Sequence, residues 1–338
     1  MLKERQRKPG VVGSSTELLE NASGRIAGTE LFARLAIKTI VPDAERRNEI
    51  ASAYADSVKA ARRVGVEAYD APLAGKTPES QRLITLLAGA LTNPESEFIY
   101  PKSLGRLYDV LESGSNVVLA ANHYSTADGI ALMSLLKRAD AGRYDQIFDR
   151  VVVVMRVQKR TAFDLQAMAF FNGFNRVQVY SPRDFGRYPK EEHQAMTFHN
   201  IAALRELNRE VKAGGKMFIV FPQGGTVRTG VLEEAPKEAG QIFELATRSV
   251  RDAFLMPVYI QGTLDMFRTK GAPLSHRLKP CKIRVSVGEL SDLKPLVAEA
   301  HATAEKTSAD QRGCVVKAVM TEIARLAPPE EQGAYRIT

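Results

Sequence analysis

Short apolar runs alternate with segments of helical spacing through most of the chain after residue 104. Val117 to Ala121 is an uninterrupted apolar run, which is typical of a strand buried on both faces of a parallel sheet. Comparable runs follow at Val151–Val157, Val177–Tyr180, Met217–Phe221, Phe254–Ile260 and Ile283–Val287. Helices are predicted between them, near residues 104–112, 128–136, 196–211 and 315–326. The pattern predicts an α/β fold with a mixed, mostly parallel sheet covered by helices on both faces.

The first quarter of the chain has a different rhythm, in which apolar residues recur every three or four positions. Ile50, Tyr54 and Val58 fall on one face of a helix in this way. Thr77 and Pro78 have the residue types of a helix N-cap and first turn, and leucines at helical spacing follow them. We therefore predict a small N-terminal helical domain over residues 1–92 and an α/β domain over residues 93–338.

The composition is that of an ordinary globular protein, with 44% hydrophobic and 25% charged residues among 338. No apolar run approaches the roughly 20 residues of a membrane-spanning helix, and residues 1–8 lack the apolar core of a secretory signal. Two cysteines, Cys281 and Cys314, are too few for a disulfide framework and indicate a reducing compartment. We expect a cytoplasmic protein, or one of the plastid stroma if the basic N-terminus is a transit peptide.

The formal net charge of +8 favours acidic partners, such as an acidic carrier protein, a phosphorylated substrate, an anionic lipid surface or nucleic acid. The charge is uneven, because no acidic residue lies between Asp265 and Glu289. The basic residues of that interval are Arg268, Lys270, Arg277, Lys279, Lys282 and Arg284. Aromatic runs that could stack on bases are absent near this basic stretch, which argues against single-stranded nucleic acid.

The chemistry-bearing segment follows the first strand, where His123 precedes Asp128 by five residues. His123 lies in a strand-to-helix turn, and Asp128 falls in the first turn of the helix behind it. A carboxylate there can bond one imidazole nitrogen and leave the other nitrogen as a base. Catalytic groups in open α/β sheets gather at such carboxyl ends of strands. The structural, non-catalytic alternative is a turn histidine that is hydrogen-bonded to a helix-capping aspartate.

Two further segments have the residue types of an anion site. After the Met217–Phe221 run, Gly224 and Gly225 allow backbone N–H groups to approach an anion, and Arg228 supplies a guanidinium. After the Val177 strand, Arg183 stands at a strand end, where an anion clamp is expected. A glycine-rich turn and a surface arginine are the structural alternatives.

These segments occur in an order that resembles the glycerolipid acyltransferase superfamily. The sequence Asn122-His123 with Asp128 resembles its histidine block, and Phe221 to Arg228 resembles its Phe-Pro-Glu-Gly-Thr-Arg block. The soluble, plastid-type glycerol-3-phosphate 1-O-acyltransferases are more similar still, because 173–183 shares Gly, Asn, Val-Tyr-Ser and a basic residue with their second block. A strand with proline, 255–259, resembles the fourth block and is expected to be structural. The resemblance covers residues from about 80 to 290.

The resemblance implies transfer of a fatty acyl group from acyl carrier protein or coenzyme A to the sn-1 hydroxyl of glycerol 3-phosphate, the first step of phospholipid synthesis. It implies that His123 is the general base and that Asp128 orients it. The implied substrate-binding residues are Asn122, Arg183, Gly224, Gly225, Thr226 and Arg228. It implies no metal and no bound cofactor, and peripheral contact with an anionic membrane is a further expectation.

Three departures from the family pattern bear on the acceptor. Thr226 stands where the plastid-type enzymes have the first of two arginines, Asp184 stands where they have a histidine, and Gln223 replaces the glutamate of membrane-bound relatives. A lysophospholipid or another alcohol is therefore an alternative acceptor. An alternative from another class is a non-catalytic basic protein that binds anionic membrane or nucleic acid and tolerates changes at His123.

Overall fold

The computed structural model describes residues 43–69, 71–90, 95–100, 102–125, 128–157, 171–227, 229–266 and 282–337. The strands are β1 Leu73–Ala74, β2 Glu97–Ile99, β3 Asn116–Ala121, β4 Val151–Arg156, β5 Asn175–Val179, β6 Met217–Val220, β7 Ala253–Gln261, β8 Arg284–Val287 and β9 Ser291–Asp292. The α-helices are α2 Ala44–Tyr69, α3 Pro78–Ala90, α4 Leu107–Glu112, α5 Asp128–Ala139, α6 Tyr144–Asp149, α8 Pro182–Phe185, α9 His193–Ala213, α10 Gly240–Ala246, α11 Leu293–Thr307 and α12 Gln311–Ala324. The 3-10 helices are η1 Lys102–Arg106, η2 Lys190–Glu192, η3 Lys237–Ala239, η4 Thr263–Met266, η6 Pro329–Glu331 and η7 Gly333–Tyr335.

The strands form one sheet in the order β1-β5-β4-β6-β3-β7-β8-β2, and β9 pairs with β7. The central strands β5, β4, β6, β3 and β7 run parallel to one another, whereas β8 is antiparallel to β7 and β1 to β5. Strand β3 lies between β6 and β7, so its carboxyl end is flanked by two parallel strand ends. This is the edge of an open sheet at which ligands bind.

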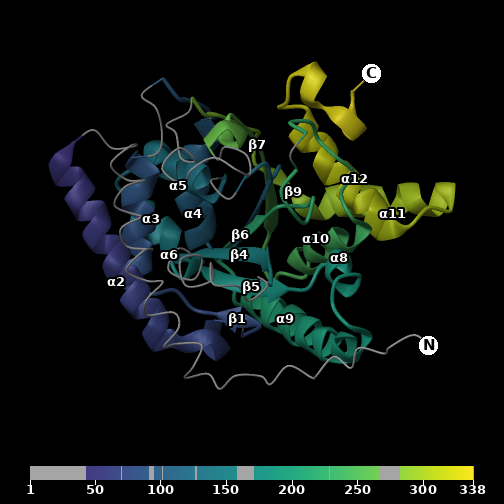
Figure 1. Cartoon of the computed structure of the whole chain (residues 1–338). Coiled ribbons are helices and arrows are strands. Elements are labelled where there is room, and N and C mark those ends of the chain that lie inside the picture. Colours follow the sequence, from purple (N-terminus) through teal and green to yellow (C-terminus); the bar gives the residue numbers. More distant parts are fainter. Residues whose placement is uncertain are drawn as a thin grey trace, which may run out of the picture.

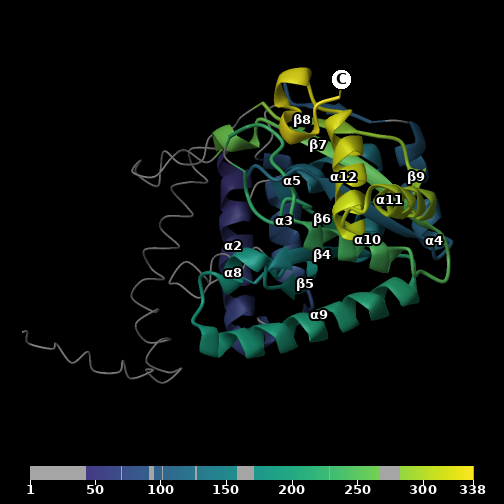
Figure 2. The same cartoon turned by 90° about the vertical axis from the view of Figure 1, so that its right-hand side faces the viewer.

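Side chains of the central strand face two separate cores. Val117 and Leu119 belong to the core beneath α3, α4, α5 and α6, whereas Val118 and Ala120 belong to the core beneath α9, α10, α11 and α12. Figure 1 shows the two groups of helices on opposite sides of the sheet. Figure 2 shows α9 running lengthwise below β4 and β5. Because helices cover both faces of the sheet, the sequence of β3 is a continuous apolar run.

The N-terminal helices add a further layer on the first face. Helix α2 packs against α3, and α3 packs against α5. Ile50 of α2 and Leu83 and Ile84 of α3 belong to the same buried core as the sheet. The division of the chain into domains at residue 92 stays a prediction.

The turn from α9 into β6 depends on two glycines. Gly214 and Gly215 have φ angles of 74° and 66°, in the left-handed region that favours glycine. A Cβ atom on Gly214 would lie 2.4 Å from the carbonyl oxygen of Gly114, in the turn that precedes β3. The backbone N–H of Gly215 donates to that same carbonyl at 3.0 Å. This close approach brings the start of β6 against the start of β3.

The predicted fold class is confirmed, with helices on both faces of a mostly parallel sheet and helices in the described N-terminal part. The pattern did not predict the strands β1, β2 and β9 or the helices α6, α8, α10 and α11. The three strands have only two or three residues each, which is too short for an alternation to be visible. None of the helices in the described ranges is long and apolar enough to cross a membrane.

Candidate active site

The turn that carries His123 begins where β3 ends, and its backbone is tied to β7. The Asn122 side chain accepts from the Ile260 N–H at 2.7 Å and donates to the Ile260 carbonyl at 2.8 Å. Asn122 is fully buried. Its amide therefore continues the β3–β7 ladder by one step after the backbone has turned away, and this anchors the residue that precedes His123.

Asp128, the first residue of α5, turns back onto this strand end. Its Oδ2 atom lies 2.9 Å from His123 Nδ1 and accepts from the backbone N–H groups of Tyr124 at 2.7 Å and Ser125 at 2.9 Å. The side chain is fully buried, so these donors replace the hydration that Oδ2 has lost, whereas the buried Oδ1 atom has no hydrogen-bond partner among the described residues. Because a carboxylate accepts, Nδ1 of the neutral imidazole carries the proton and Nε2 has the lone pair.

The loop after β6 holds the other side of the histidine turn. The His123 ring stacks on Phe221, with centroids 4.3 Å apart and an interplanar angle of 24°. The His123 backbone N–H donates to Gln223 Oε1 at 3.1 Å, and its carbonyl accepts from Val227 N–H at 2.7 Å. The imidazole is 21% exposed. The ring is thus held on one face and remains accessible to a small reactant.

The glycine loop lies beside this ring. Gly224 has a φ angle of 68°, and its N–H donates to the Phe221 carbonyl at 3.0 Å within the turn. Gly224, Gly225 and the exposed Thr226 line the same cavity as His123. Arg228, the predicted anion ligand of this loop, lies outside the described residues.

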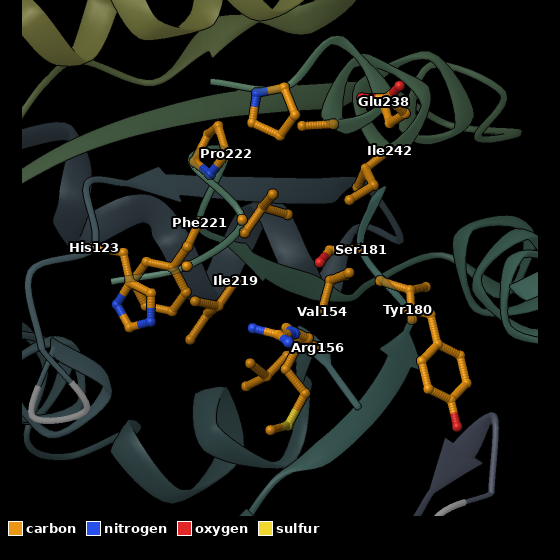
Figure 3. Close-up of a pocket in the computed structure, with 18 of the residues that line it drawn as sticks. His123, Val154, Arg156, Tyr180, Ser181, Ile219, Phe221, Pro222, Glu238 and Ile242 are labelled. Atoms are coloured by element: carbon orange, nitrogen blue, oxygen red, sulfur yellow. The ribbon is translucent and has the colours of Figure 1, made fainter. Parts of the chain in front are cut away.

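A cavity of about 640 Å³ extends from His123 over the ends of β6, β4 and β5 to α8, α9 and α10. Figure 3 shows His123 and Phe221 at one end of this cavity and Tyr180 at the other. The wall between them is mainly apolar and includes Val154, Val179, Leu204, Ile219 and Ile242. A cavity of this size and character accommodates an extended apolar chain whose reactive end lies at the imidazole.

Arg156, at the end of β4, is a charged residue of the wall that the sequence analysis did not select. Its Nε donates to Asp184 Oδ2 at 2.8 Å, and its Nη2 contacts Oδ1. Asp184 is fully buried and also accepts from the backbone N–H and the hydroxyl of Ser181, each at 2.7 Å. The Asp184 charge is therefore compensated by Arg156. The only signal in the sequence was a charged residue at the carboxyl end of an apolar run.

The remaining predicted residues are placed as follows. Arg183 lies in the short helix α8 behind the capping residue Ser181, and its side chain lies outside the described part of the chain.

Of the basic stretch, residues 267–281 are outside the described ranges. Lys282 and Arg284 are described, and both pair with Glu97, at 2.9 and 3.7 Å. The hydrogen bond and charge of Lys282 lower the pKa of the Glu97 carboxyl.

Other groups that could carry chemistry have structural partners. His193 Nε2 lies 3.1 Å from the Tyr188 carbonyl, and His199 Nε2 lies 2.9 Å from the Gln178 carbonyl. Cys314 is a half-buried thiol in α12. Within the described ranges, no three His, Cys, Asp or Glu side chains gather as a metal site would require. Of the His123–Asp128 pair, the imidazole opens on the large cavity, which Arg156 and Glu238 also line.

Comparison with known proteins finds a family match over the central part of the chain. Residues 106–261 match the family model described as Acyltransferase. This range begins just before α4 and ends with the last residue of β7, so it includes the histidine turn, β4, β5 and the glycine loop. No curated protein gives a significant match to the chain. This match covers less than half of the chain and supports an enzyme that transfers acyl groups to a lipid-type acceptor.

Proposed function

We propose that this acyltransferase moves a fatty acyl group from a carrier thioester to the sn-1 hydroxyl of glycerol 3-phosphate. The observation that carries the proposal is the His123–Asp128 pair, a buried carboxylate 2.9 Å from an imidazole that borders a large apolar cavity. The match of residues 106–261 to the acyltransferase family supports the reaction class.

His123 is the general base in this proposal. Its Nε2 takes the proton of the acceptor hydroxyl while the hydroxyl oxygen attacks the thioester carbonyl carbon. The tetrahedral intermediate then collapses, the carbon–sulfur bond breaks, and the imidazolium returns its proton to the leaving thiolate. Asp128 stabilises the imidazolium that exists between these steps. Direct attack requires no acyl-enzyme intermediate, so no activated serine or cysteine is needed.

The fatty acyl chain occupies the apolar cavity in this proposal. Val154, Ile219 and Ile242 offer it aliphatic surface, and burial of each methylene contributes about 0.8 kcal/mol. The thioester carbonyl then lies at the end of the cavity next to His123. This arrangement uses binding energy from the unreactive chain to place the reacting carbon.

The acceptor phosphate requires cations at the other side of the imidazole. Arg183 and Arg228 are proposed for this role from the family resemblance, and the backbone N–H groups at Gly225 and Thr226 are proposed to assist. Asp184 does not oppose the phosphate with an unpaired charge, because Arg156 and Ser181 bind its carboxylate. The substitution at Asp184 is thus compatible with an anionic acceptor.

Acyl carrier protein or coenzyme A is the proposed donor carrier. Both are acidic, and the basic interval Arg268–Arg284 in a chain of net charge +8 would attract either. An anionic membrane surface is proposed as a peripheral partner because the product is an amphiphile. The proposed reaction uses no metal and no resident cofactor.

The test is acyl transfer from a radiolabelled acyl thioester, measured with and without glycerol 3-phosphate. We expect acceptor-dependent product with the wild-type protein, and a rate lower by roughly 10²- to 10⁴-fold in His123→Ala because the base is lost. His301→Ala is the matched control, since this histidine lies in α11 and pairs with Glu244, away from the cavity. It should retain the wild-type rate.

Other results would identify the alternatives. Transfer to a lysophospholipid but not to glycerol 3-phosphate would show that the replacement of an arginine by the exposed Thr226 has changed the acceptor. Full activity in His123→Ala would refute the mechanism. A folded wild-type protein without turnover, but with salt-sensitive binding to anionic vesicles or nucleic acid, would favour the non-catalytic alternative.

A further inference from the structure

Two buried tyrosine hydroxyls meet directly behind the histidine turn. Tyr124, the residue after His123, and Tyr259 of β7 are 3% and 1% exposed. Their hydroxyl oxygens lie 3.0 Å apart, and their rings meet edge to face. The Tyr124 hydroxyl is also 3.0 Å from the carbonyl oxygen of Gly230, just beyond the glycine loop. Burial raises the pKa of Tyr124 to about 12 and also raises that of Tyr259, so both remain protonated donors near neutral pH.

The chain of hydroxyls ends at Glu331, in the 3-10 helix η6 near the C-terminus. The Tyr259 hydroxyl donates to Glu331 Oε2, and Gln261 Nε2 donates to Oε1 at 2.7 Å. The backbone carbonyl of the same residue accepts from the Leu232 N–H at 2.9 Å. Glu331 therefore binds the end of β7 with its side chain and the segment after the glycine loop with its main chain.

The segment around Glu331 is itself firmly held. Gln332 donates to the carbonyls of Ala324 and Ala327 at 3.1 and 3.2 Å, at the end of α12. The Ala334 N–H donates to the Leu232 carbonyl at 2.9 Å. The Tyr335 hydroxyl accepts from the Ala235 N–H at 2.9 Å. Residues 331–335, which we call the C-terminal clasp, are thus bound both to the end of α12 and to the segment 232–235 that follows the glycine loop.

The C-terminal clasp connects both to the histidine turn and to the segment that follows the glycine loop. Through Tyr259 it bonds Tyr124, whose own N–H donates to Asp128 Oδ2. Through Leu232 and Ala235 it fixes the segment that follows Val227, whose N–H donates to the His123 carbonyl. These contacts lie far along the chain from His123, and residues 331–335 lie beyond the range of the family match.

We propose that Glu331 is a positioning residue, which sets the placement of the His123–Asp128 pair relative to the glycine loop through Tyr259 and Tyr124. This inference rests on the proposed function, because it assigns a catalytic consequence to the bonds of the clasp. A displacement of the imidazole by about 1 Å can cost about 100-fold in rate, so loss of these bonds should act on turnover.

The experiment compares Glu331→Ala, Glu331→Gln and Tyr259→Phe with the wild-type protein. Tyr144→Phe is the control for Tyr259→Phe, since Tyr144 is also buried but lies in α6, in the core on the other face of the sheet. Glu322→Ala is the control for Glu331→Ala, because Glu322 lies in α12 and forms a surface pair with Arg325. The readouts are kcat and KM for acyl transfer, the unfolding midpoint, and the low-field NMR resonance of the His123 Nδ1 proton, assigned by its loss in His123→Ala.

We expect Glu331→Ala and Tyr259→Phe to lower kcat by ~10- to 100-fold. KM for the thioester should change less than about twofold, and the Nδ1 resonance should broaden or shift. Glu331→Gln keeps an acceptor of the same shape and should recover most of the turnover. The double variant that combines Tyr259→Phe with Glu331→Ala should be no slower than Glu331→Ala, because both changes break the same chain of hydrogen bonds. The two control variants should match the wild type in kcat and in the resonance.

Two results would overturn the inference. One is an unchanged kcat and an unchanged resonance in folded Tyr259→Phe and Glu331→Ala. The other is a lower unfolding midpoint with the wild-type kcat in the folded fraction, which would make the clasp a stabilising contact only. Failure of the proposed function is distinguishable, because the wild-type protein would then transfer no acyl group while the Nδ1 resonance still reported the effect of each variant.

Discussion

At the scale of single residues, the chemistry of His123 depends on how Asp128 is solvated by the protein. The carboxylate is fully buried, and three N–H groups converge on one of its oxygens. Two of them belong to the backbone of the same turn, and the aspartate also lies at the positive end of α5. A negative charge is therefore stable here at a position where it can offset the charge of a protonated imidazole.

Replacement of Asp128 by asparagine tests this charge. The amide keeps an oxygen for the backbone donors, so we expect the fold and the thioester KM to be nearly unchanged. The turnover number should fall by roughly 10²- to 10⁴-fold, because the imidazolium loses its counter-charge. Acyl-transfer kinetics measure this directly. Asp140→Asn is the matched control, because Asp140 directly follows the other end of α5 and pairs with Arg143. An equal loss there would contradict the assignment.

At the scale of secondary structure, the walls of the cavity come from the carboxyl ends of parallel strands and from the helices that cover them. The parallel strands β4, β5 and β6 end side by side, and α9 and α10 cover them from one face. Helix α9 has one face toward the cavity and one toward solvent, because Leu204 lines the cavity while Ile201 is 42% exposed. One helix therefore closes the cavity and forms part of the molecular surface.

A larger residue at position 204 should shorten the cavity. We expect Leu204→Trp to lower kcat/KM for long-chain acyl thioesters by ~10-fold or more, while short-chain thioesters remain good substrates, because one methylene is worth about 0.8 kcal/mol of burial. A series of thioesters of increasing chain length measures the effect. Ile201→Trp, on the exposed face of the same helix, should leave the profile unchanged. A uniform loss over all chain lengths in Leu204→Trp would place the acyl chain elsewhere.

Contacts within one strand–turn–helix unit can be predicted from the sequence, whereas contacts between remote elements cannot. The His123–Asp128 contact spans five residues of one strand–turn–helix unit, so spacing alone indicated it. The Arg156–Asp184 pair spans 28 residues and depends on the pairing of β4 with β5. The Tyr259 side chain was expected to be only structural, and its link to Glu331 spans 72 residues. Such contacts leave no local pattern in the chain.

At the scale of the whole molecule, the sheet separates two apolar cores, and buried tyrosines lie in both. Tyr144 belongs to the first core, and Tyr124 and Tyr259 belong to the second. Burial raises the pKa of Tyr144 and of Tyr124 to about 12 from the ordinary value of 10.0, and it raises the pKa of Tyr259 as well. The folded protein thus keeps tyrosine protons that the unfolded chain releases above pH 10.

We therefore expect the free energy of unfolding to fall as pH rises from about 10 toward 12. The contribution is complete below the tyrosine pKa of the unfolded chain, and it is lost as the pH approaches the higher folded-state value. Urea unfolding between pH 8 and pH 11.5 measures the slope. Tyr144→Phe should reduce the slope, whereas Tyr100→Phe, at a position 42% exposed, should not. A slope that is the same in both variants would contradict the prediction.

The fold class and the His123–Asp128 contact could be predicted from the amino-acid sequence, because both depend on short-range patterns. Apolar runs bounded by helical spacing specify strands and crossovers, and the interval from His123 to Asp128 lies within one turn. Tertiary structure alone decided the extent of the cavity, the pairing of Arg156 with Asp184 and the position of the C-terminal clasp. These features arise where segments remote in sequence pack together, and the free energy of that packing depends on the whole arrangement rather than on any one segment.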